Sequence, residues 1–248
     1  MIKSQAPHFI YPDWPDDPRI KAMTTSRKGG VSRAPFNGLN LAGHVGDRDE
    51  DISQNRATLT AHAELPSSPF WLHQVHGIDC VEAIDLQNEP PVADASYTQQ
   101  PKQVLAVLTA DCLPILMKNE EASWVAACHA GWRGLLNGVI ESTLANYNGN
   151  KEKISAWIGP AISKKHFEVG EDVLQLFTEK DKHHKKFFEP KGNNKYWFDY
   201  VELAKQQMES MGLTVYGGSY CTFEDSANFY SYRRDGESGR IASLIWIE

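Results

Sequence analysis

Three residues that can bind a metal ion interrupt apolar stretches of the sequence: His76, Cys112 and His129. Two imidazoles and one thiolate supply three ligands to zinc and leave its fourth position to water, as in catalytic zinc sites. In such a site the metal polarises substrate oxygens and lowers the pKa of the bound water towards neutrality. The residue types therefore predict a catalytic metal centre.

The spacing of these residues indicates that the fold brings them together, because they lie much farther apart than the ligands of a zinc finger. Cys112 and His129 are expected just past the ends of apolar strands, and His76 in the turn after another strand. His73 and Cys128 stay open as alternatives, since periodicity does not separate them from their neighbours. A hydrogen-bonded core histidine and a cysteine that packs as a small apolar side chain are the structural alternatives to metal ligation.

Apolar runs predict the elements that must position these residues. Continuous apolar runs are typical of strands buried on both faces, and they occur at 104–109, 114–117, 124–128 and 154–158. Further strands are expected at 20–26, 70–74, 80–84, 213–216, 229–232 and 241–247, and helices at 49–65, 134–147, 170–177 and 199–211. A long loop is expected over 27–47 and a solvated one over 181–186. Strands and helices alternate too irregularly along the sequence for a doubly wound parallel sheet. We therefore predict an α+β fold of mixed β-sheets covered by helices, and a single domain over residues 1–248.

Charge and composition narrow the class of ligand. The 248 residues carry a formal net charge of −7, and the pI is about 5.7. Nucleic acids and membrane surfaces attract proteins with a positive field, so we expect neither as a partner. The sequence shows neither the apolar segment of a signal peptide nor a run long enough to span a membrane, which favours a cytoplasmic protein. Its four cysteines are then expected as reduced thiols or metal ligands.

Six sequence motifs resemble those of the laccase-domain family of bacterial proteins: TTSRKGGVS, HQVHG, TADCLPIL, CHAGWRG, IGPAI and FYSYRR. That family was first described as multicopper polyphenol oxidoreductases and later as purine nucleoside phosphorylases with adenosine deaminase activity. The motifs run from about residue 22 to residue 245 in the order that the family shows. The resemblance implies an α/β/β/α sandwich with zinc bound by His76, Cys112 and His129, while His73 matches no ligand of the family.

Further polar residues of these motifs are candidates for the site. Asp111 could orient a ligand imidazole or act as the general acid and base, and Gln74 could face the same cleft. Arg133 is expected at a helix start between two glycines, where a phosphate could be bound. Six more residues match family positions and are candidate substrate or phosphate contacts: Arg27, Asn40, His44, Arg56, Arg233 and Arg234. A salt-bridged or solvated arginine, and a turn carboxylate for Asp111, are the structural alternatives.

Chemistry on purine nucleosides is the function that the resemblance favours. We expect phosphorolysis of adenosine, inosine, guanosine and also methylthioadenosine to the free base and ribose 1-phosphate, with deamination of adenosine at the same metal. Deamination needs a metal-activated water at C6 of the base. The zinc-deaminase signature HxE…PCxxC is absent from the sequence, so the deaminating site would be a convergent one.

Three other functions stay open at this point. A His2Cys set can bind copper as well as zinc, which would allow laccase-like oxidation of polyphenols. Multicopper oxidases use pairs of histidines in HxH motifs, however, and none of the 9 histidines here forms one. Cys112 and His129 could instead be the nucleophile and base of a cysteine hydrolase. Editing of cell-wall precursors, attributed to some members of the family, is the third alternative.

Overall fold

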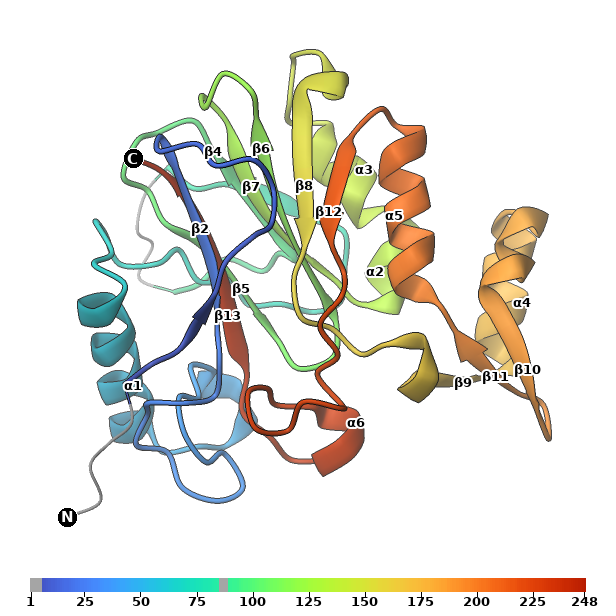
Figure 1. Ribbon diagram of the computed structural model, residues 1–248, viewed down its shortest axis with the longest axis horizontal. Helices are drawn as coiled ribbons and strands as arrows, with labels where there is room; N and C mark the ends of the chain where they lie inside the picture. Colours follow the sequence, from blue (N-terminus) through green and yellow to red (C-terminus); the bar gives the residue numbers. More distant parts are fainter. Residues whose placement is uncertain (1–5, 85–88) are drawn as a thin grey trace.

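Two β-sheets stacked face to face form the centre of the protein, as shown in a computed structural model that describes residues 6–84 and 89–248 (Figure 1). The first sheet has four antiparallel strands in the order β1-β2-β13-β5: β1 (Phe9–Ile10), β2 (Ile20–Thr25), β13 (Ile241–Ile247) and β5 (Leu105–Thr109). Both β5 and β13 are buried along their whole length, because one face meets the second sheet and the other meets a helix layer. This double burial explains their continuous apolar sequences.

The second sheet has six strands in the order β12-β8-β6-β7-β4-β3 and is mixed, since β12–β8 and β3–β4 are parallel pairs while the other pairs are antiparallel. Its strands are β12 (Thr214–Gly217), β8 (Ile154–Ile158), β6 (Leu113–Asn119), β7 (Val125–Ala130), β4 (Ala95–Thr98) and β3 (Cys80–Glu82). Residues of both sheets form the inner core, among them Val107 and Ile245 of the first sheet and Leu116 and Ala127 of the second.

Helices cover the two outer faces. On the first sheet lies α1 (Asp49–His62), whose first turn carries Asp49, Glu50 and Asp51, a placement that the helix dipole favours. On the second sheet lie α2 (Trp132–Asn137), α3 (Val139–Leu144) and α5 (Tyr200–Ser210). The order helix, sheet, sheet, helix confirms the predicted α+β class and the α/β/β/α layering. That the chain forms one domain over residues 1–248 stays a prediction.

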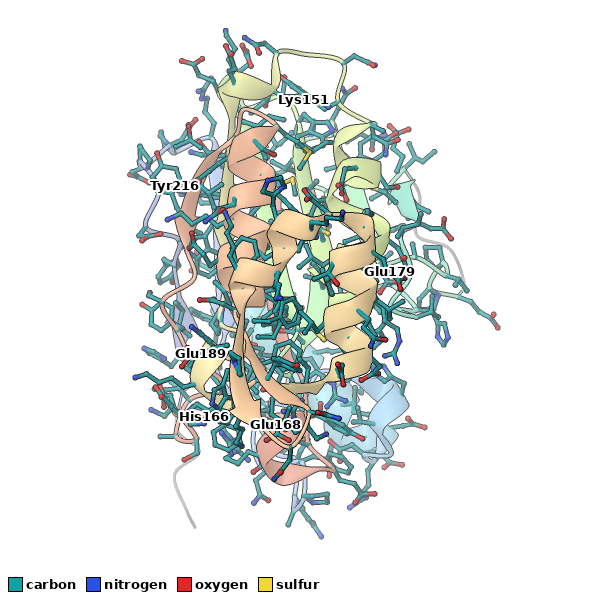
Figure 2. The ribbon with its side chains drawn as sticks, turned by 90° about the vertical axis from the view of Figure 1, so that its right-hand side faces the viewer. Lys151, His166, Glu168, Glu179, Glu189 and Tyr216 are labelled. Atoms are coloured by element: carbon teal, nitrogen blue, oxygen red, sulfur yellow. The ribbon has the colours of Figure 1, made fainter. Side chains whose placement is uncertain are left out.

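A small third sheet extends from one side of the sandwich, and the sequence did not predict it. It contains β9 (Glu168–Gly170), β10 (Phe188–Gly192) and β11 (Lys195–Phe198) in the order β10-β11-β9. The helix α4 (Glu171–Lys180) packs beside it, as Figure 2 shows from the side on which Glu168, Glu179 and Glu189 lie. Stacked rings of Phe188 and Phe198, with centroids 4.1 Å apart, fix this hairpin to the core below.

Four predicted elements differ from the structure. The segment 70–74 forms no strand and makes only isolated bridges, at Phe70 and His73. The helix expected over 134–147 is two helices, because Gly138 has a φ of +102° that ends α2. Segment 229–232 is not a strand and leads into one helical turn, α6 (Tyr232–Asp235). The loop over 181–186 is largely a 3-10 helix, Lys182–Phe187.

Shorter 3-10 helices occur at Gly43–Val45, Lys151–Lys153 and Lys164–His166. Within the described ranges, no helix is both long and apolar enough to cross a membrane. The first five residues, part of the N-terminal segment in which no signal peptide was expected, lie outside the described residues.

Candidate metal centre

His76, Cys112 and His129 converge at one end of the two central sheets. One donor atom from each lies within 4.8 Å of the other two. The Cys112 Sγ is 3.8 Å from the His76 Nε2, and the two imidazole rings meet edge to face with centroids 4.8 Å apart. The prediction that the fold brings these three residues together is therefore confirmed.

Each of the three side chains comes from a different piece of backbone. Cys112 lies in the short connection between β5 and β6, directly before Leu113 begins β6. His129 lies inside β7, opposite Pro114 of β6, so its expected place just past a strand end is wrong by one or two residues. His76 lies in a loop with a φ of +61°, an uncommon conformation for a residue other than glycine.

The fully buried carboxylate of Asp94 holds two of these residues in place. Its Oδ1 lies 2.7 Å from the Nδ1 of His129 and accepts a bond from the backbone N–H of His76 at 2.9 Å. Its Oδ2 accepts the N–H of Gly77 at 2.6 Å and that of Val75 at 3.2 Å. Because Asp94 engages the Nδ1 of His129, the Nε2 is left to face the cluster, an arrangement common to metal-binding histidines. These bonds also account for the uncommon backbone conformation of His76.

Gly131 leaves the space that the cluster needs. A Cβ atom at this position would lie 2.7 Å from the Cδ2 of His76 and 3.4 Å from the Sγ of Cys112. Any larger residue would therefore push the imidazole of His76 out of position. The glycine of the HAGW motif is explained by this close approach.

The three groups alter one another's protonation. Burial alone would raise the pKa of Cys112, but the charge of His129 and hydrogen bonds from His129 and His76 lower this pKa to about 6. Burial would lower the pKa of His129, and Cys112 and Asp94 raise it to about 9. Burial would likewise raise the pKa of Asp94, and the bond to His129 lowers it. Cys112 is thus a thiolate at neutral pH, the form that binds metals.

Two cavities share part of their walls at Cys112, and both are also lined by Ala110 and Tyr232. The first, of about 290 Å³, is also lined by His44, Gln74, His76, Leu108, Thr109, His129 and Arg240. The second, of about 170 Å³, has a mostly aromatic and apolar wall made by Asp111, Trp132, Ile162, Phe167, Tyr200 and Arg233. The predicted candidates His44, Gln74, Asp111 and Arg233 thus all line this pair of cavities.

Gln74 fixes the loop that carries His76. Its side-chain amide donates to the carbonyl of Leu108 at 2.9 Å and accepts the N–H of Leu108 at 2.8 Å. This pair of hydrogen bonds ties the loop to β5, and Gln74 also lines the first cavity. Gln74 therefore has a structural role beside any contact with a ligand.

Asp111 does not orient a ligand imidazole, and that prediction was wrong, because Asp94 does so. One carboxylate oxygen of Asp111 accepts a bond from the Thr222 hydroxyl at 2.6 Å, and the other accepts the N–H of Arg233 at 2.7 Å. The hydroxyl of Tyr200 donates to the backbone carbonyl of Asp111. Asp111, with a φ of +89°, anchors the turn that presents Cys112.

Two predicted contact residues, Asn40 and Arg234, make hydrogen bonds within the protein and do not line either cavity. Asn40 is fully buried and donates to the Asp47 carboxylate at 2.8 Å, and it accepts the N–H of Ala42 at 3.1 Å. Arg234 donates to the carbonyls of Thr222, Phe223 and Phe229 and pairs with Asp235. Both side chains shape the loops around the site.

Three predicted arginines also lie outside the walls of these two cavities. Arg27 stacks on the Tyr230 ring and donates to backbone carbonyls at 3.3 to 3.4 Å. Arg56 lies over the Trp71 ring and donates to the carbonyl of Leu41 at 2.9 Å. Arg133 is exposed and packs over Trp132, at 4.2 Å from the ring centroid.

Sequence reasoning missed Asp94, Tyr232 and Arg240. Asp94 immediately precedes a short buried strand, β4, that also went unpredicted, and this polar residue at a strand start was the available signal. Tyr232 lies inside the FYSYRR motif, in which the sequence indicates only Arg233 and Arg234 as candidate contacts. Arg240 has no distinguishing neighbours in the sequence, and only the fold brings it to the cavity.

The chain is similar to known proteins over almost its whole length. It is 44% identical over 240 residues to the purine nucleoside phosphorylase YfiH of Escherichia coli, covering 96% of this chain and 98% of that protein. It is 42% identical over 242 residues to the purine nucleoside phosphorylase PA4543 of Pseudomonas aeruginosa, with 97% and 98% covered. The crystal structure of the Neisseria meningitidis protein NMB0706 superposes with a TM-score of 0.93 at 41% identity, covering 97% of this chain and 99% of that one.

A family model agrees with these similarities. The model described as "Multi-copper polyphenol oxidoreductase laccase" matches residues 21–248, a range that includes His76, Cys112 and His129. The family that the sequence motifs resemble is thereby confirmed, and the chain belongs to the multi-copper polyphenol oxidoreductase laccase family.

Proposed function

We propose that the chain is a zinc-dependent purine nucleoside enzyme. It would cleave adenosine, inosine, guanosine and methylthioadenosine with phosphate to the free base and a ribose 1-phosphate ester, and would hydrolyse the amino group of adenosine to ammonia at the same site. The observation that carries the proposal is a His2Cys cluster at the junction of two cavities. The proposal is also supported by two similar proteins that are named purine nucleoside phosphorylase.

The donor set fits zinc better than the harder divalent cations. Two imidazole nitrogens and one thiolate are ligands that zinc prefers, whereas magnesium and calcium prefer oxygen. The lowered pKa of Cys112 and the Asp94 bond to His129 prepare both residues for ligation. Zinc held by these three residues would supply a Lewis acid and a water of lowered pKa.

The two cavities suit the two halves of a nucleoside reaction. The aromatic cavity, with Trp132, Phe167 and Tyr200 on its wall, offers flat apolar surfaces to a purine base. The first cavity contains Arg240, whose Nη1 donates to the carbonyls of Ser238 and Gly239. The rest of that guanidinium can bind an anion, and burial, which lowers the pKa of Arg240, makes an anionic partner more valuable there.

Asp111 is the carboxylate proposed to exchange protons with the base. It lines the aromatic cavity next to Cys112, and each oxygen accepts one hydrogen bond from the protein. A carboxylate oxygen has room for a second partner, so Asp111 can still accept a proton and, once protonated, donate it to a purine nitrogen. This role follows from position and is separate from the anchoring bonds described above.

A cysteine hydrolase is the second candidate, because a ring nitrogen of His129 lies within 4.8 Å of the Cys112 sulfur and both residues line the first cavity. The pKa of about 6 for Cys112 and of about 9 for His129 describe a thiolate beside an imidazolium, as an activated nucleophile requires. A thiolate bound to zinc is a poor free nucleophile. Zinc occupancy therefore separates the two functions, and phenol oxidation only after addition of copper would indicate the oxidase alternative.

The test of the proposed function uses protein of measured zinc content and four nucleosides: adenosine, inosine, guanosine and methylthioadenosine. With phosphate, we expect hypoxanthine and ribose 1-phosphate from inosine; without phosphate, we expect only ammonia release from adenosine. Products are identified by chromatography and mass spectrometry. If zinc-loaded protein releases neither base nor ammonia from any of them, the proposal is wrong.

Two arginine variants locate the phosphate. Arg240→Gln should weaken the use of phosphate by about 2 kcal/mol, the order expected for a charge-assisted bond to a desolvated anion. Deamination needs no phosphate and should change less. Arg133→Gln is the matched control, because Arg133 is the exposed arginine that the sequence indicated. If only the Arg133 variant loses phosphate use, the anion lies at α2 and the assignment to Arg240 fails.

A further inference from the structure

A second group of metal-binding residue types lies outside the candidate metal centre: His166, Cys221 and Glu224. Within the part of the chain that the structure describes, it is the other cluster in which three such donor atoms lie within 4.8 Å of one another. The group offers one nitrogen, one sulfur and one oxygen. Neither the proposed reaction nor the similarity to relatives assigns any role to these residues.

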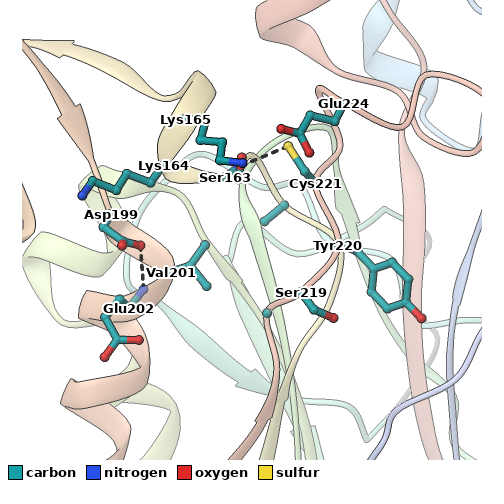
Figure 3. Close-up of a pocket in the computed structure, with 12 residues that line it drawn as sticks. Ser163, Lys164, Lys165, Asp199, Val201, Glu202, Ser219, Tyr220, Cys221 and Glu224 are labelled. Atoms are coloured by element: carbon teal, nitrogen blue, oxygen red, sulfur yellow. Dashed lines mark hydrogen bonds between the residues drawn. The ribbon is translucent and has the colours of Figure 1, made fainter. Parts of the chain in front are cut away.

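The backbone around this outer cluster is held by its own hydrogen bonds. His166 ends the 3-10 helix Lys164–His166, and Cys221 forms a bridge with Ala161 at the start of the same segment. The N–H of Ser163 donates to the Sγ of Cys221 at 3.4 Å, as Figure 3 shows. The sulfur is thereby directed towards the 3-10 helix, and an N–H donor of this kind suits a metal-bound thiolate.

The other two side chains are also oriented. The ring of His166 stacks on that of Phe223, with centroids 4.3 Å apart and an angle of 12° between the planes. Its Nε2 lies 2.9 Å from the Oε1 of Glu224. A surface His–Glu pair alone contributes little to stability, and it gives no reason for a cysteine sulfur at the same point.

Solvent can reach the outer cluster. The side chains of His166 and Glu224 are 28% and 51% exposed, whereas Cys221 is 9% exposed. Cys221 and Glu224 lie together at one end of a cavity of about 450 Å³, whose wall also carries Lys164, Lys165 and Asp199 (Figure 3). An ion could therefore enter from this cavity and replace the direct contact between His166 and Glu224.

We propose that His166, Cys221 and Glu224 form a second binding site for a divalent transition metal ion of the zinc class. Imidazole, thiolate and carboxylate are all zinc ligands, and the thiolate disfavours magnesium and calcium. Binding releases the thiol proton of Cys221 to solvent, so that the bound sulfur is anionic. Three protein ligands leave one position open towards water.

The outer site is connected to the candidate metal centre through one residue. Thr222, next to Cys221, donates its hydroxyl to the carboxylate of Asp111 at 2.6 Å, and its N–H donates to the carbonyl of Ala161 at 3.0 Å. Asp111 in turn precedes Cys112. An ion that fixes Cys221 and Glu224 would therefore stabilise the turn that presents the Cys112 thiolate, which gives the second metal a structural role in the first site.

Titration with Co²⁺ tests this site without any measurement of activity. Cobalt replaces zinc in thiolate sites and gives a thiolate-to-metal absorption band. Metal-free wild-type protein should bind two equivalents with such a band. Cys112→Ser should retain one equivalent with its thiolate band, and Cys221→Ser should retain the other. The double variant should bind no cobalt through a thiolate.

Two further variants keep the test decisive if a cysteine variant folds poorly. Glu224→Gln changes an exposed side chain and should weaken the second binding step by more than about 100-fold, since even residues behind the ligands change metal affinity by up to that factor. Lys165→Ala, which changes a neighbour outside the cluster, should bind two equivalents as wild type does. A single equivalent in wild-type protein, or a second equivalent that Glu224→Gln binds as tightly as wild type, would overturn the proposal.

Discussion

Cys112 directly precedes β6, and Cys128 lies in the neighbouring strand β7. Their surroundings shift the pKa values of the two thiols in opposite directions. Cys128 lies in the middle of β7 and points into the core under α3, where it is fully buried. Cys80 of β3 lies two strands away in the same layer and shares its partner Thr143. Burial raises the pKa of Cys128, and it raises that of Cys80 to about 12. Cys112, at the strand end beside two imidazoles, instead has a pKa of about 6.

The difference shows that position along a strand, and not burial alone, makes a cysteine chemically useful. Cys128 and His129 are consecutive residues of one strand, so their side chains point to opposite faces of the sheet. The histidine faces the candidate metal centre, and the cysteine faces the helix layer. Both Cys112 and Cys128 lose solvent on folding, but only Cys112 gains positive partners that stabilise its thiolate.

The largest expected effect is on the rate of alkylation. In metal-free protein at pH 7, most of Cys112 should be thiolate, because its pKa is lowered to about 6, whereas almost none of Cys80 should be, because burial raises its pKa to about 12. Iodoacetamide should therefore modify Cys112 and leave Cys80 and Cys128 unmodified, as peptide mass spectrometry would measure. The thiolate is lost when the pH falls through the folded pKa, so the rate at Cys112 should drop below pH 6 and stay level from pH 7 to 8.

The same experiment has an internal control. Zinc-loaded protein should be protected at Cys112, because the sulfur is then a ligand. A rate at Cys112 that keeps rising up to pH 9, as for an ordinary thiol, would contradict the lowering of the Cys112 pKa by His129 and remove the contrast between Cys112 and Cys128.

A smaller effect is expected from the residue behind the ligands. Asp94→Asn replaces the carboxylate that holds His129 and the N–H groups of His76 and Gly77. Zinc affinity should fall by about 10- to 100-fold, the range typical of such supporting residues. Competition with a fluorescent chelator measures this change. Asp79→Asn, at an exposed carboxylate nearby, should leave the affinity unchanged, and equal affinities in both variants would show that Asp94 does not support the metal.

The strands with continuous apolar sequences, β5, β6, β7, β8 and β13, were predictable because burial on both faces leaves a strong pattern. The short strands β4 and β9 were not, since three or four residues form no recognisable period. Gly138 broke a predicted helix through a left-handed backbone that helical periodicity does not reveal.

The residues of the candidate site likewise divide into those with a local sequence signal and those without one. Side chains carried by motifs, such as Cys112 and His129, were found from residue type and the resemblance to a family. Asp94 and Arg240 reach the site only through long-range packing, which the sequence does not encode locally. Asn40 and Arg234 stand at motif positions that indicated a contact with a ligand. Their side chains instead make hydrogen bonds within the protein that fix the loops around the site.

The assignment of the metal ligands is tested most directly by comparing the two histidines of the HQVHG motif. His73 is exposed, and its backbone forms a bridge with Val92, whereas the Nε2 of His76 faces Cys112. His76→Ala and His73→Ala are each combined with Cys221→Ser, so that only the candidate metal centre can bind zinc through a thiolate. Both proteins are purified without chelator, and their zinc content is measured by mass spectrometry. In the His73 variant we expect about one zinc per chain and the same release of hypoxanthine from inosine as in the Cys221→Ser parent, and in the His76 variant we expect loss of both. Full zinc content in His76→Ala, or loss of zinc in His73→Ala alone, would contradict ligation of the metal by His76.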